Sequence, residues 1–420
     1  MKDPASVQVG RVNVMKFGGT SVADTDKIRS VARRMVATHE TGRPTVGVVS
    51  AMGETTDTLA ALAAEVSPRP HPREMDMLLS TGERITAALC AMAIEDMGHR
   101  AVSLTGSQAG IVTDTRHTNA KIVDIRPKRI TEALEAGMIV LVAGFQGVST
   151  AYDVTTLGRG ASDLTAVALA AALGGDCEIY TDVEGVYTAD PRIVPGARKL
   201  ARVSPLEMLE MAGSGARVLQ LRSVEFARNH GVPIHVRSTF SGTEGTWIRE
   251  DPSMEDAIIS GITHTVDEAY VTLTDVPDKP GTAAGIFNAV AAAGINVDTI
   301  IQNAVTHGDA DVTFSIPRDD LPLMTDTIEG LCRDLGLHWG VDDTAGKISM
   351  IGAGMKSHPG VAARMFQTLA DHGINVRMIA TSPIKVSCVI ARAKVDEAVL
   401  ALHDAFQVEL ELAQSGAAHA

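Results

Sequence analysis

A lysine, two glycines and two hydroxyl side chains follow a short apolar stretch near the N-terminus: residues 12–21 read VNVMKFGGTS. Glycines let backbone N–H groups approach an anion, Lys16 supplies a positive charge, and the hydroxyls donate hydrogen bonds. A helix capped by Asp24 is expected next, so that strand, turn and helix form an anion site. A Gly-Gly pair after a strand is more often a plain tight turn, and it is the lysine that favours a phosphate site.

The chain contains no P-loop of the form GxxxxGK[ST] and neither the HRD nor the DFG element of protein kinases, so a nucleotide site must be of another type. Four more motifs follow in order: SAMG at 50–53, TGER at 81–84, LGRGASD at 157–163 and YTADPR at 187–192. Together with KFGGTS, this series resembles the aspartate kinases, which are members of the amino-acid kinase family.

An amino-acid substrate presents an ammonium group and carboxylates, so its pocket should contain an acid and a guanidinium. The resemblance implies that Glu83 binds the ammonium group and Arg159 the α-carboxylate. Glu83 lies in an otherwise apolar helix expected over residues 78–89, where an exposed i, i+4 partner is the alternative role. The other implied substrate-binding residues are Ser50, Thr56, Gly160, Ser162 and Asp163. Helix capping would also explain Ser50 and Thr56, and Ser162 and Asp163 are expected to cap a helix beginning at Leu164.

Phosphoryl transfer depends on alignment and charge stabilisation rather than on covalent help from the protein. Lys16 is the catalytic candidate for charge stabilisation, and the resemblance implies that Asp163 orients the reacting carboxylate. That carboxylate is already ionised at pH 7, so no general base is needed. The resemblance implies ATP with Mg²⁺, whose protein ligands stay unknown. ATP is expected to contact Lys16, Phe17, Gly18, Gly19, Ser21, Thr181, Asp182, Tyr187, Asp190, Arg192 and Arg217. Arg217 departs from the family, in which lysine is usual, so its contact with ATP is the least secure.

Composition narrows the class of protein. The chain has 420 residues, enough for two or three domains, with 45% hydrophobic and 3% aromatic residues and a net charge of −14. That charge disfavours nucleic-acid binding. The N-terminal residues contain no apolar signal core, and the longest strongly apolar run, residues 138–145, is too short to cross a bilayer. The cysteines show no CxxC spacing, which favours a reducing, cytoplasmic location over disulfides or a zinc site. They are Cys90, Cys177, Cys332 and Cys388.

Apolar strands alternate with helical stretches from residue 12 to about residue 237, which predicts a layered α/β domain with a largely parallel central sheet. Ligand residues are then expected at the carboxyl ends of the strands. The expected fold class is an amino-acid kinase fold followed by two ferredoxin-like βαββαβ ACT modules. The expected boundaries are 1–245 for the catalytic domain, 246–262 for a linker, 263–342 and 343–412 for the two ACT domains, and 413–420 for a disordered tail.

An internal repeat with an offset of 79 residues supports the two modules. PGTAAGIF at 280–287 aligns with PGVAARMF at 359–366, and GINV at 294–297 aligns with GINV at 373–376. The pattern resembles the ACT module, which binds small amino acids; a duplicated dimerisation domain without a ligand is the alternative. Arg377 stands where the first copy has Asp298, so the two copies are not expected to be equivalent sites. The resemblance implies effector contacts at Asp278, Gly281, Thr282, Ala283, Asn296, Asp298, Gln302, Asn375 and Val376.

The resemblance therefore implies an ATP-dependent kinase that phosphorylates the side-chain carboxylate of L-aspartate, the first step towards lysine, threonine and methionine. Lysine, threonine or both are the expected effectors. The alternatives are a kinase for another amino acid such as glutamate, and a sensor that binds amino acids without catalysis. A fusion with homoserine dehydrogenase is excluded by length and by the lack of a GxGxxG motif after a strand. An oligomer formed through the ACT modules is expected, either a homodimer or an α2β2 assembly whose small subunit starts inside the reading frame at Met254.

Overall fold

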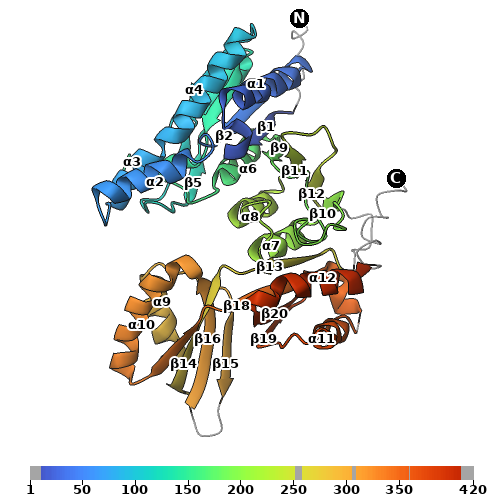
Figure 1. Ribbon diagram of the computed structural model, residues 1–420. Coiled ribbons are helices and arrows are strands. Elements are labelled where there is room, and N and C mark those ends of the chain that lie inside the picture. Colours follow the sequence, from blue (N-terminus) through green and yellow to red (C-terminus); the bar gives the residue numbers. More distant parts are fainter. Residues whose placement is uncertain (1–10, 251–257, 305–308, 359, 408–420) are drawn as a thin grey trace, which may run out of the picture. The chain divides into compact units, whose positions relative to one another are not determined.

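The computed structural model describes residues 11–250, 258–304, 309–358 and 360–407. These residues form two compact units (Figure 1). The N-terminal unit contains residues 11–187, 199–213 and 217–250, and the C-terminal unit contains residues 188–198, 214–216 and 258 onwards. The predictions for Met254, for the whole tail at 413–420 and for part of the linker lie outside the described residues.

An eight-stranded sheet forms the centre of the N-terminal unit, in the order β10-β12-β11-β9-β1-β2-β6-β3. Every pairing in it is parallel except the one between β11 and β12, which confirms a largely parallel sheet. Two of the central strands, β2 and β6, are buried at every position because helices cover both faces of the sheet. The strands are β1 (Asn13–Phe17), β2 (Thr45–Val49), β3 (Ala101–Leu104), β6 (Ile139–Ala143), β9 (Asp176–Thr181), β10 (Arg202–Val203), β11 (Ile234–Ser238) and β12 (Thr246–Ile248).

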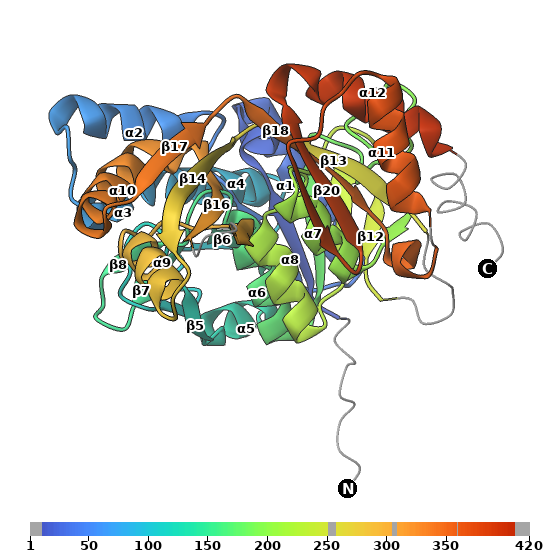
Figure 2. The same ribbon diagram turned by 90° about the horizontal axis from the view of Figure 1, so that it is seen from below.

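Helices α1 (Thr25–Glu40) and α4 (Thr81–Asp96) cover one face of this sheet, and α6 (Ser162–Leu173) and α8 (Leu221–His230) cover the other (Figures 1 and 2). Asp24 caps α1 by accepting a hydrogen bond from the Lys27 N–H, as the sequence predicts. A second sheet, β5-β4-β7-β8, extends this unit. The remaining elements of the unit are η1 (Gly19–Val22), α2 (Thr55–Val66), α3 (Pro72–Leu79), β4 (Ile111–Thr113), β5 (Ile122–Ile125), α5 (Lys128–Glu135), β7 (Gln146–Ser149), β8 (Val154–Thr156) and α7 (Pro205–Gly213).

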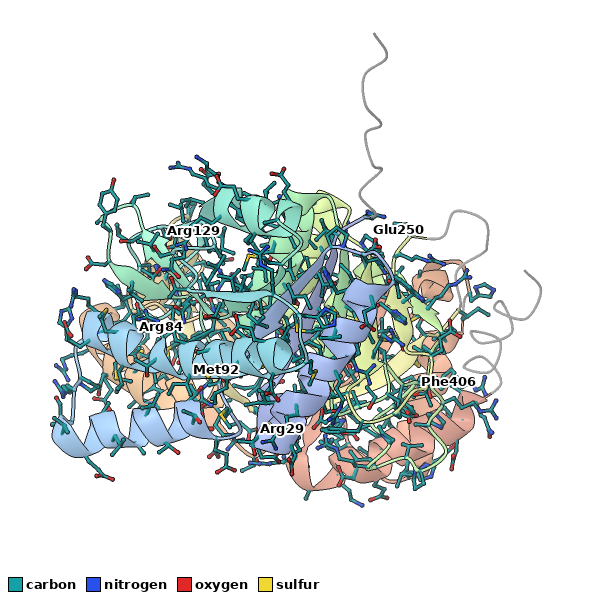
Figure 3. The ribbon with its side chains drawn as sticks, turned by 90° about the horizontal axis from the view of Figure 1, so that it is seen from above. Arg29, Arg84, Met92, Arg129, Glu250 and Phe406 are labelled. Carbon is teal, nitrogen blue, oxygen red and sulfur yellow. The ribbon has the colours of Figure 1, made fainter. Side chains whose placement is uncertain are left out.

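The helix expected over residues 78–89 is two helices, α3 and α4, which meet at Ser80. By length and composition alone, Pro72–Asp96 is the one helical stretch among the described residues that could cross a membrane. It carries the buried carboxyl groups of Asp76 and Glu83 and packs against the sheet core. Arg84 and Met92 lie along α4 in Figure 3. The apolar character of this stretch is therefore explained by the packing of α3 and α4 in the α/β domain.

The C-terminal unit contains two four-stranded antiparallel sheets. The first has the order β15-β16-β14-β17, and α9 and α10 pack on one of its faces (Figure 1). Its elements are β14 (Glu268–Pro277), α9 (Thr282–Ala292), β15 (Ile300–Ala304), β16 (Asp309–Pro317), η2 (Arg318–Asp320), α10 (Leu321–Leu335) and β17 (His338–Asp342). This is the predicted βαββαβ sequence of elements.

The second sheet has the order β13-β18-β20-β19. Its fourth strand, β13 (Gly261–Thr265), comes from the chain before the first module and pairs antiparallel with β18. Residues 263–265 thus lie in the second sheet rather than in the module that was expected to begin at 263. The other elements are β18 (Ala345–Ile351), η3 (Ala353–Ser357), α11 (Val361–Asp371), β19 (Met378–Ser382), β20 (Lys385–Ala391), η4 (Arg392–Lys394) and α12 (Val395–Ala405).

Opposite charges occupy equivalent positions of the two repeat copies. Glu268 and Asp298 in the first copy correspond, at the offset of 79, to Lys347 and Arg377 in the second. Lys347 Nζ lies 2.7 Å from Glu268 Oε1 and 2.6 Å from Asp298 Oδ2, with only 3% of its side chain exposed. Burial lowers the pKa of Lys347, but the two carboxylates outweigh burial and raise it. Arg377 pairs with Asp342 at the end of β17. The opposite charges at equivalent positions therefore form ion pairs that link the two modules.

Residues 188–198 are part of the C-terminal unit although both flanking segments belong to the N-terminal unit. Ala189 and Val194 are buried in the core formed by β13, β18, β20, α11 and α12. The carbonyl of Thr188 accepts a hydrogen bond from Ile262 N, and its hydroxyl lies 3.1 Å from His403 Nε2. Nothing in the local sequence pattern anticipated this exchange between the units.

Candidate active site

The carboxyl ends of four neighbouring strands bring several predicted residues to one edge of the sheet. β9, β1, β2 and β6 are adjacent, and the register aligns Lys16 with Val48 and with Ile179. Ser50 directly follows β2, and Asp182 directly follows β9. The edge position matches the expectation that ligand residues gather where parallel strands end.

Lys16 and Asp163 form a nearly buried ion pair at this edge. Strand alternation directs Met15 and Phe17 into the core that includes α1 and α4, so Lys16 faces the opposite side, where α6 begins. Lys16 Nζ lies 2.6 Å from Asp163 Oδ1, with 12% and 8% of the two side chains exposed. The other carboxylate oxygen accepts a hydrogen bond from Gln220 N at 3.3 Å. The pair thus places a positive charge and a fixed carboxylate side by side.

Helix α6 begins at Ser162 rather than at Leu164, so the expectation that Ser162 and Asp163 cap it is wrong. The N-cap residue is Ala161, which makes no side-chain capping bond. Both predicted caps instead lie in the first turn, where the partial positive charge of the helix N-terminus favours a carboxylate. A carboxylate held here stays available for other partners.

The two glycines after β1 lie against the turn that follows β2. Gly53 N donates to the carbonyl of Gly19 at 3.1 Å, and a Cβ on Gly19 would come within 3.1 Å of the carbonyl oxygens of Ala51 and Gly53. The turn is therefore built for close backbone approach. Ser21 departs from the expected pattern because its hydroxyl is buried and lies 2.6 Å from Thr239 Oγ1.

Phe17 is fully buried, and its ring stacks on Tyr180 with 4.9 Å between centroids. Its carbonyl accepts a hydrogen bond from Ser50 N at 3.1 Å. The ring of Phe17 is thus a packing element beneath the glycine turn, and it is buried away from any ligand.

Glu83 is a buried carboxyl group in the first turn of α4. Gly82 allows this turn to approach the loop after β2, since a Cβ there would lie 2.8 Å from the Cβ of Ala51. Glu83 Oε1 accepts a hydrogen bond from Ala51 N at 3.3 Å, and Oε2 has no hydrogen-bond partner among the described residues. Burial raises the pKa of Glu83 to about 7. Such a group is suited to a ligand ammonium, which would supply the missing partner.

Arg159 lies between two glycines in left-handed conformations, Gly158 at φ 96° and Gly160 at φ 74°. Its side chain is 84% exposed, and Nη2 lies 2.9 Å from Asp57 Oδ1 at the start of α2. An exposed guanidinium paired with one surface carboxylate is weakly held, and a substrate carboxylate can replace that partner. Ser50, which follows β2, and Thr56, in the first turn of α2, are both half-buried.

The residues predicted around the rest of ATP divide between the two units. Thr181 donates its hydroxyl to Asp182 at 3.0 Å, and burial together with the nearby Glu184 raises the pKa of Tyr187. Asp190 and Arg192 pair with each other in the segment that belongs to the C-terminal unit. The hydrogen bonds from Arg192 lower the pKa of Asp190. Arg217 is an exposed residue of the N-terminal unit. The structure therefore does not bring Asp190 and Arg192 together with Lys16 in one unit.

Most predicted effector residues are exposed around the start of α9 and the loop before β15. Gly281 has φ 99° and is the N-cap residue of α9, which leaves the first turn of the helix open. Asp298 is already paired with Lys347. Thr282 and Val376 are half-buried, and the exposed members of the set are Asp278, Gly281, Ala283, Asn296, Asp298, Gln302 and Asn375.

Three residues that the sequence analysis did not select support the predicted loops. Asp76 is fully buried, Gln220 donates to both Asp163 and the carbonyl of Arg159, and Arg222 contacts Leu157. Asp76 could have been found by the argument used for Glu83, because it too is an acid within an apolar helical stretch. No group of three or more His, Cys, Asp or Glu side chains that could hold a metal occurs among the described residues.

Comparison with known families agrees with this arrangement. Residues 11–238 match the amino acid kinase family, and residues 270–333 and 348–406 each match an ACT domain family. The chain belongs to the amino acid kinase family.

Within that family the similarity is to aspartokinases. The aspartokinase of Mycolicibacterium smegmatis is 55% identical over 401 residues, which cover 94% of this chain and 95% of the relative. The crystal structure of E. coli aspartokinase III with aspartate and ADP in the R-state has a TM-score of 0.82 at 23% identity, and it covers 94% of this chain and 100% of that one. The T-state structure with lysine and aspartate has a TM-score of 0.72 at 23% identity, covering 94% and 99%. These findings confirm the family resemblance and the fold class.

Proposed function

We propose that the chain transfers the γ-phosphoryl group of ATP to the side-chain carboxylate of L-aspartate, giving 4-phospho-L-aspartate and ADP. The observation that carries the proposal is the Lys16–Asp163 pair at the sheet edge, together with Glu83, whose Oε1 is bound by the loop after β2 and whose Oε2 has no partner among the described residues. The extensive identity to aspartokinases supports aspartate as the acceptor.

In this reaction Lys16 stabilises the negative charge that develops on the transferred phosphoryl group, and the backbone of Gly18 and Gly19 approaches the phosphates. Asp163 orients the reacting side chain of the substrate. Glu83 binds the substrate ammonium through Oε2, and Arg159 exchanges Asp57 for the α-carboxylate. Because the attacking carboxylate is ionised, the protein moves no proton in the chemical step.

Magnesium accompanies ATP in the proposal, and when bound it neutralises charge on the phosphates. Magnesium in nucleotide sites is commonly held by the phosphates and by one or two carboxylates, and it keeps several waters. Asp163 would contact that ion through water.

The ACT modules receive lysine, threonine or both as effectors, and inhibition follows if an effector binds one arrangement of the protein better than another. The α9 N-terminus offers N–H groups to an effector carboxylate. We further propose a cytoplasmic oligomer, either a homodimer or an α2β2 assembly.

The test is ADP release by the purified chain with MgATP and L-aspartate, compared with L-glutamate, and repeated with lysine, threonine and their mixture. Aspartate-dependent turnover that effectors suppress is the expected result. Turnover with glutamate but not with aspartate would show that glutamate is the substrate. Tight amino-acid binding without turnover would favour a sensor that binds amino acids without catalysis.

A pH profile tests the role of Glu83. Because its pKa is about 7 in the protein, the carboxyl group is mostly ionised at pH 8 and mostly protonated at pH 6, and only the ionised form attracts an ammonium group. We expect kcat/KM for aspartate to fall about tenfold from pH 8 to pH 6. Glu83→Gln should have a low kcat/KM that is nearly flat across this range. A wild-type profile that is also flat would contradict the role of Glu83.

A further inference from the structure

The loop that contains Arg159 and leads to Asp163 in the first turn of α6 is held from α8 by Arg222, whose side chain belongs to none of the predicted binding sets. Arg222 Nη1 donates to the carbonyl of Leu157 at 2.5 Å and to Asn119 Oδ1 at 2.9 Å. Its Nη2 donates to the carbonyl of Ala120 at 2.9 Å. One planar fork thus joins two chain segments, residues 119–120 and residue 157, just before the glycine loop begins.

Only an arginine can make this set of contacts, because three acceptors in different directions match the fixed fork of a guanidinium. A lysine at the same position would supply one ammonium at one point. Gly158 and Asn119 also pack closely against each other, since a Cβ on Gly158 would lie 3.0 Å from Asn119 Oδ1. Displacement of Asn119 or Leu157 would therefore be passed on to the glycine loop.

The same two segments are held on their other side by Asp76 of α3. This fully buried carboxylate accepts hydrogen bonds from Thr118 N at 3.1 Å and from Thr156 Oγ1 at 2.5 Å, and it lies 2.7 Å from His117 Nδ1. Thr118 has φ 64°, a conformation that a threonine holds only when its surroundings enforce it. An acid on one side and a guanidinium on the other thus fix residues 117–120 and 156–157.

The N-cap residue of α8 completes the connection to the reacting groups. Gln220, which precedes this helix, donates its side-chain amide to the carbonyl of Arg159 at 3.0 Å and its backbone N–H to Asp163 at 3.3 Å. We infer that Arg222 is a positioning residue for aspartate: it sets the path of residues 157–163 and thereby the place of Arg159 and Asp163, without itself touching the substrate. This inference rests on the proposed function.

The kinetic test compares Arg222→Ala and Arg222→Lys with Arg228→Ala, an exposed arginine on the same helix. The KM for aspartate should rise roughly tenfold or more in Arg222→Ala, while the KM for ATP changes less than twofold. Guanidinium ion at millimolar concentration should restore part of the loss, and Arg228→Ala should match the wild type. Arg222→Lys keeps the charge and the aliphatic stem, so it should fold even if Arg222→Ala does not. In this variant too, the KM for aspartate should rise while the KM for ATP stays nearly unchanged. Equal changes in both KM values would overturn the inference.

Amide hydrogen exchange gives a readout that does not depend on turnover. In Arg222→Ala or Arg222→Lys, exchange should accelerate at residues 118–121 and 157–161 and stay unchanged in α1 and α4. Unchanged exchange in those loops overturns the positioning role whatever the substrate is. A wild-type chain without aspartate-dependent ADP release would instead contradict the proposed function, with the exchange result still deciding whether Arg222 holds the loop.

Discussion

Replacement of Lys16 by methionine is expected to lower kcat for aspartate-dependent ADP release by about a thousandfold. Methionine preserves the length and packing of the side chain but removes the charge that would stabilise the transferred phosphoryl group. Asp163 also loses its partner at 2.6 Å, which leaves a carboxylate that is 8% exposed without compensation at its Oδ1. Both effects act on the chemical step, so the KM for aspartate should change much less than kcat.

The control for this measurement is Lys128→Met, which removes a lysine side chain that is 85% exposed from the same unit. It should leave kcat within twofold of the wild-type value, because an exposed i, i+4 ion pair contributes little. Full turnover by Lys16→Met would remove the mechanism, and an equal loss in both variants would point to damage from the substitution itself.

Replacement of Lys347 by methionine is expected to lower the free energy of unfolding of the C-terminal unit by about 3 kcal/mol. The substitution leaves Glu268, whose side chain is only 15% exposed, as a carboxylate without its counter-ion. Asp298 is 54% exposed and can return to water, so the expected loss lies at the low end for a broken buried ion pair. Urea unfolding followed by Trp339 fluorescence in a Trp247→Phe background reports on this unit, since Trp339 lies on β17.

A double-mutant cycle separates the ion pair from general damage. Glu268→Gln removes the negative charge and keeps an amide oxygen for the hydroxyl of Tyr270, which lies 3.0 Å from Glu268 Oε2. The double variant Glu268→Gln/Lys347→Met should be more stable than the sum of the two single losses predicts. Lys394→Met, at an exposed lysine paired with Glu397, should cost less than about 0.5 kcal/mol. A loss in Lys347→Met no larger than in Lys394→Met would contradict the role of the buried pair.

The sheet of the N-terminal unit and the repeat of the C-terminal unit were predictable from local patterns. The run Thr45–Val49 is rich in valine and is buried at every position, which is typical of a parallel strand covered on both faces. The offset of 79 residues identified two related modules because the Pro-Gly turn and the GINV segment recur together. Lys16 was likewise selectable, since a lysine near the end of a strand and just before two glycines and two hydroxyl side chains is a pattern that favours an anion site.

Two segments that pack in a different module or unit from their neighbours in sequence, β13 and residues 188–198, were not predictable. The pairing of β13 with β18 depends on a free sheet edge formed by residues far along the chain, and the pattern of β13 itself is that of any short strand. The placement of residues 188–198 depends on a core that Ala189 and Val194 complete, and their own sequence predicts only a proline-containing turn. Arg222 and Gln220 act through backbone carbonyls and N–H groups, which leave no signature in residue type.

The placement of residues 188–198 bears on how a separate regulatory subunit could exist. A polypeptide beginning near residue 258 would contain every strand of both antiparallel sheets, yet it would lack the two apolar side chains that fill its core beside Ile259 and Ile262. The N–H of Ile262 would also lose the carbonyl of Thr188. We expect such a subunit to be less stable than the same residues within the full chain, and any partner that covers this part of its core would stabilise it in proportion to the partner's concentration.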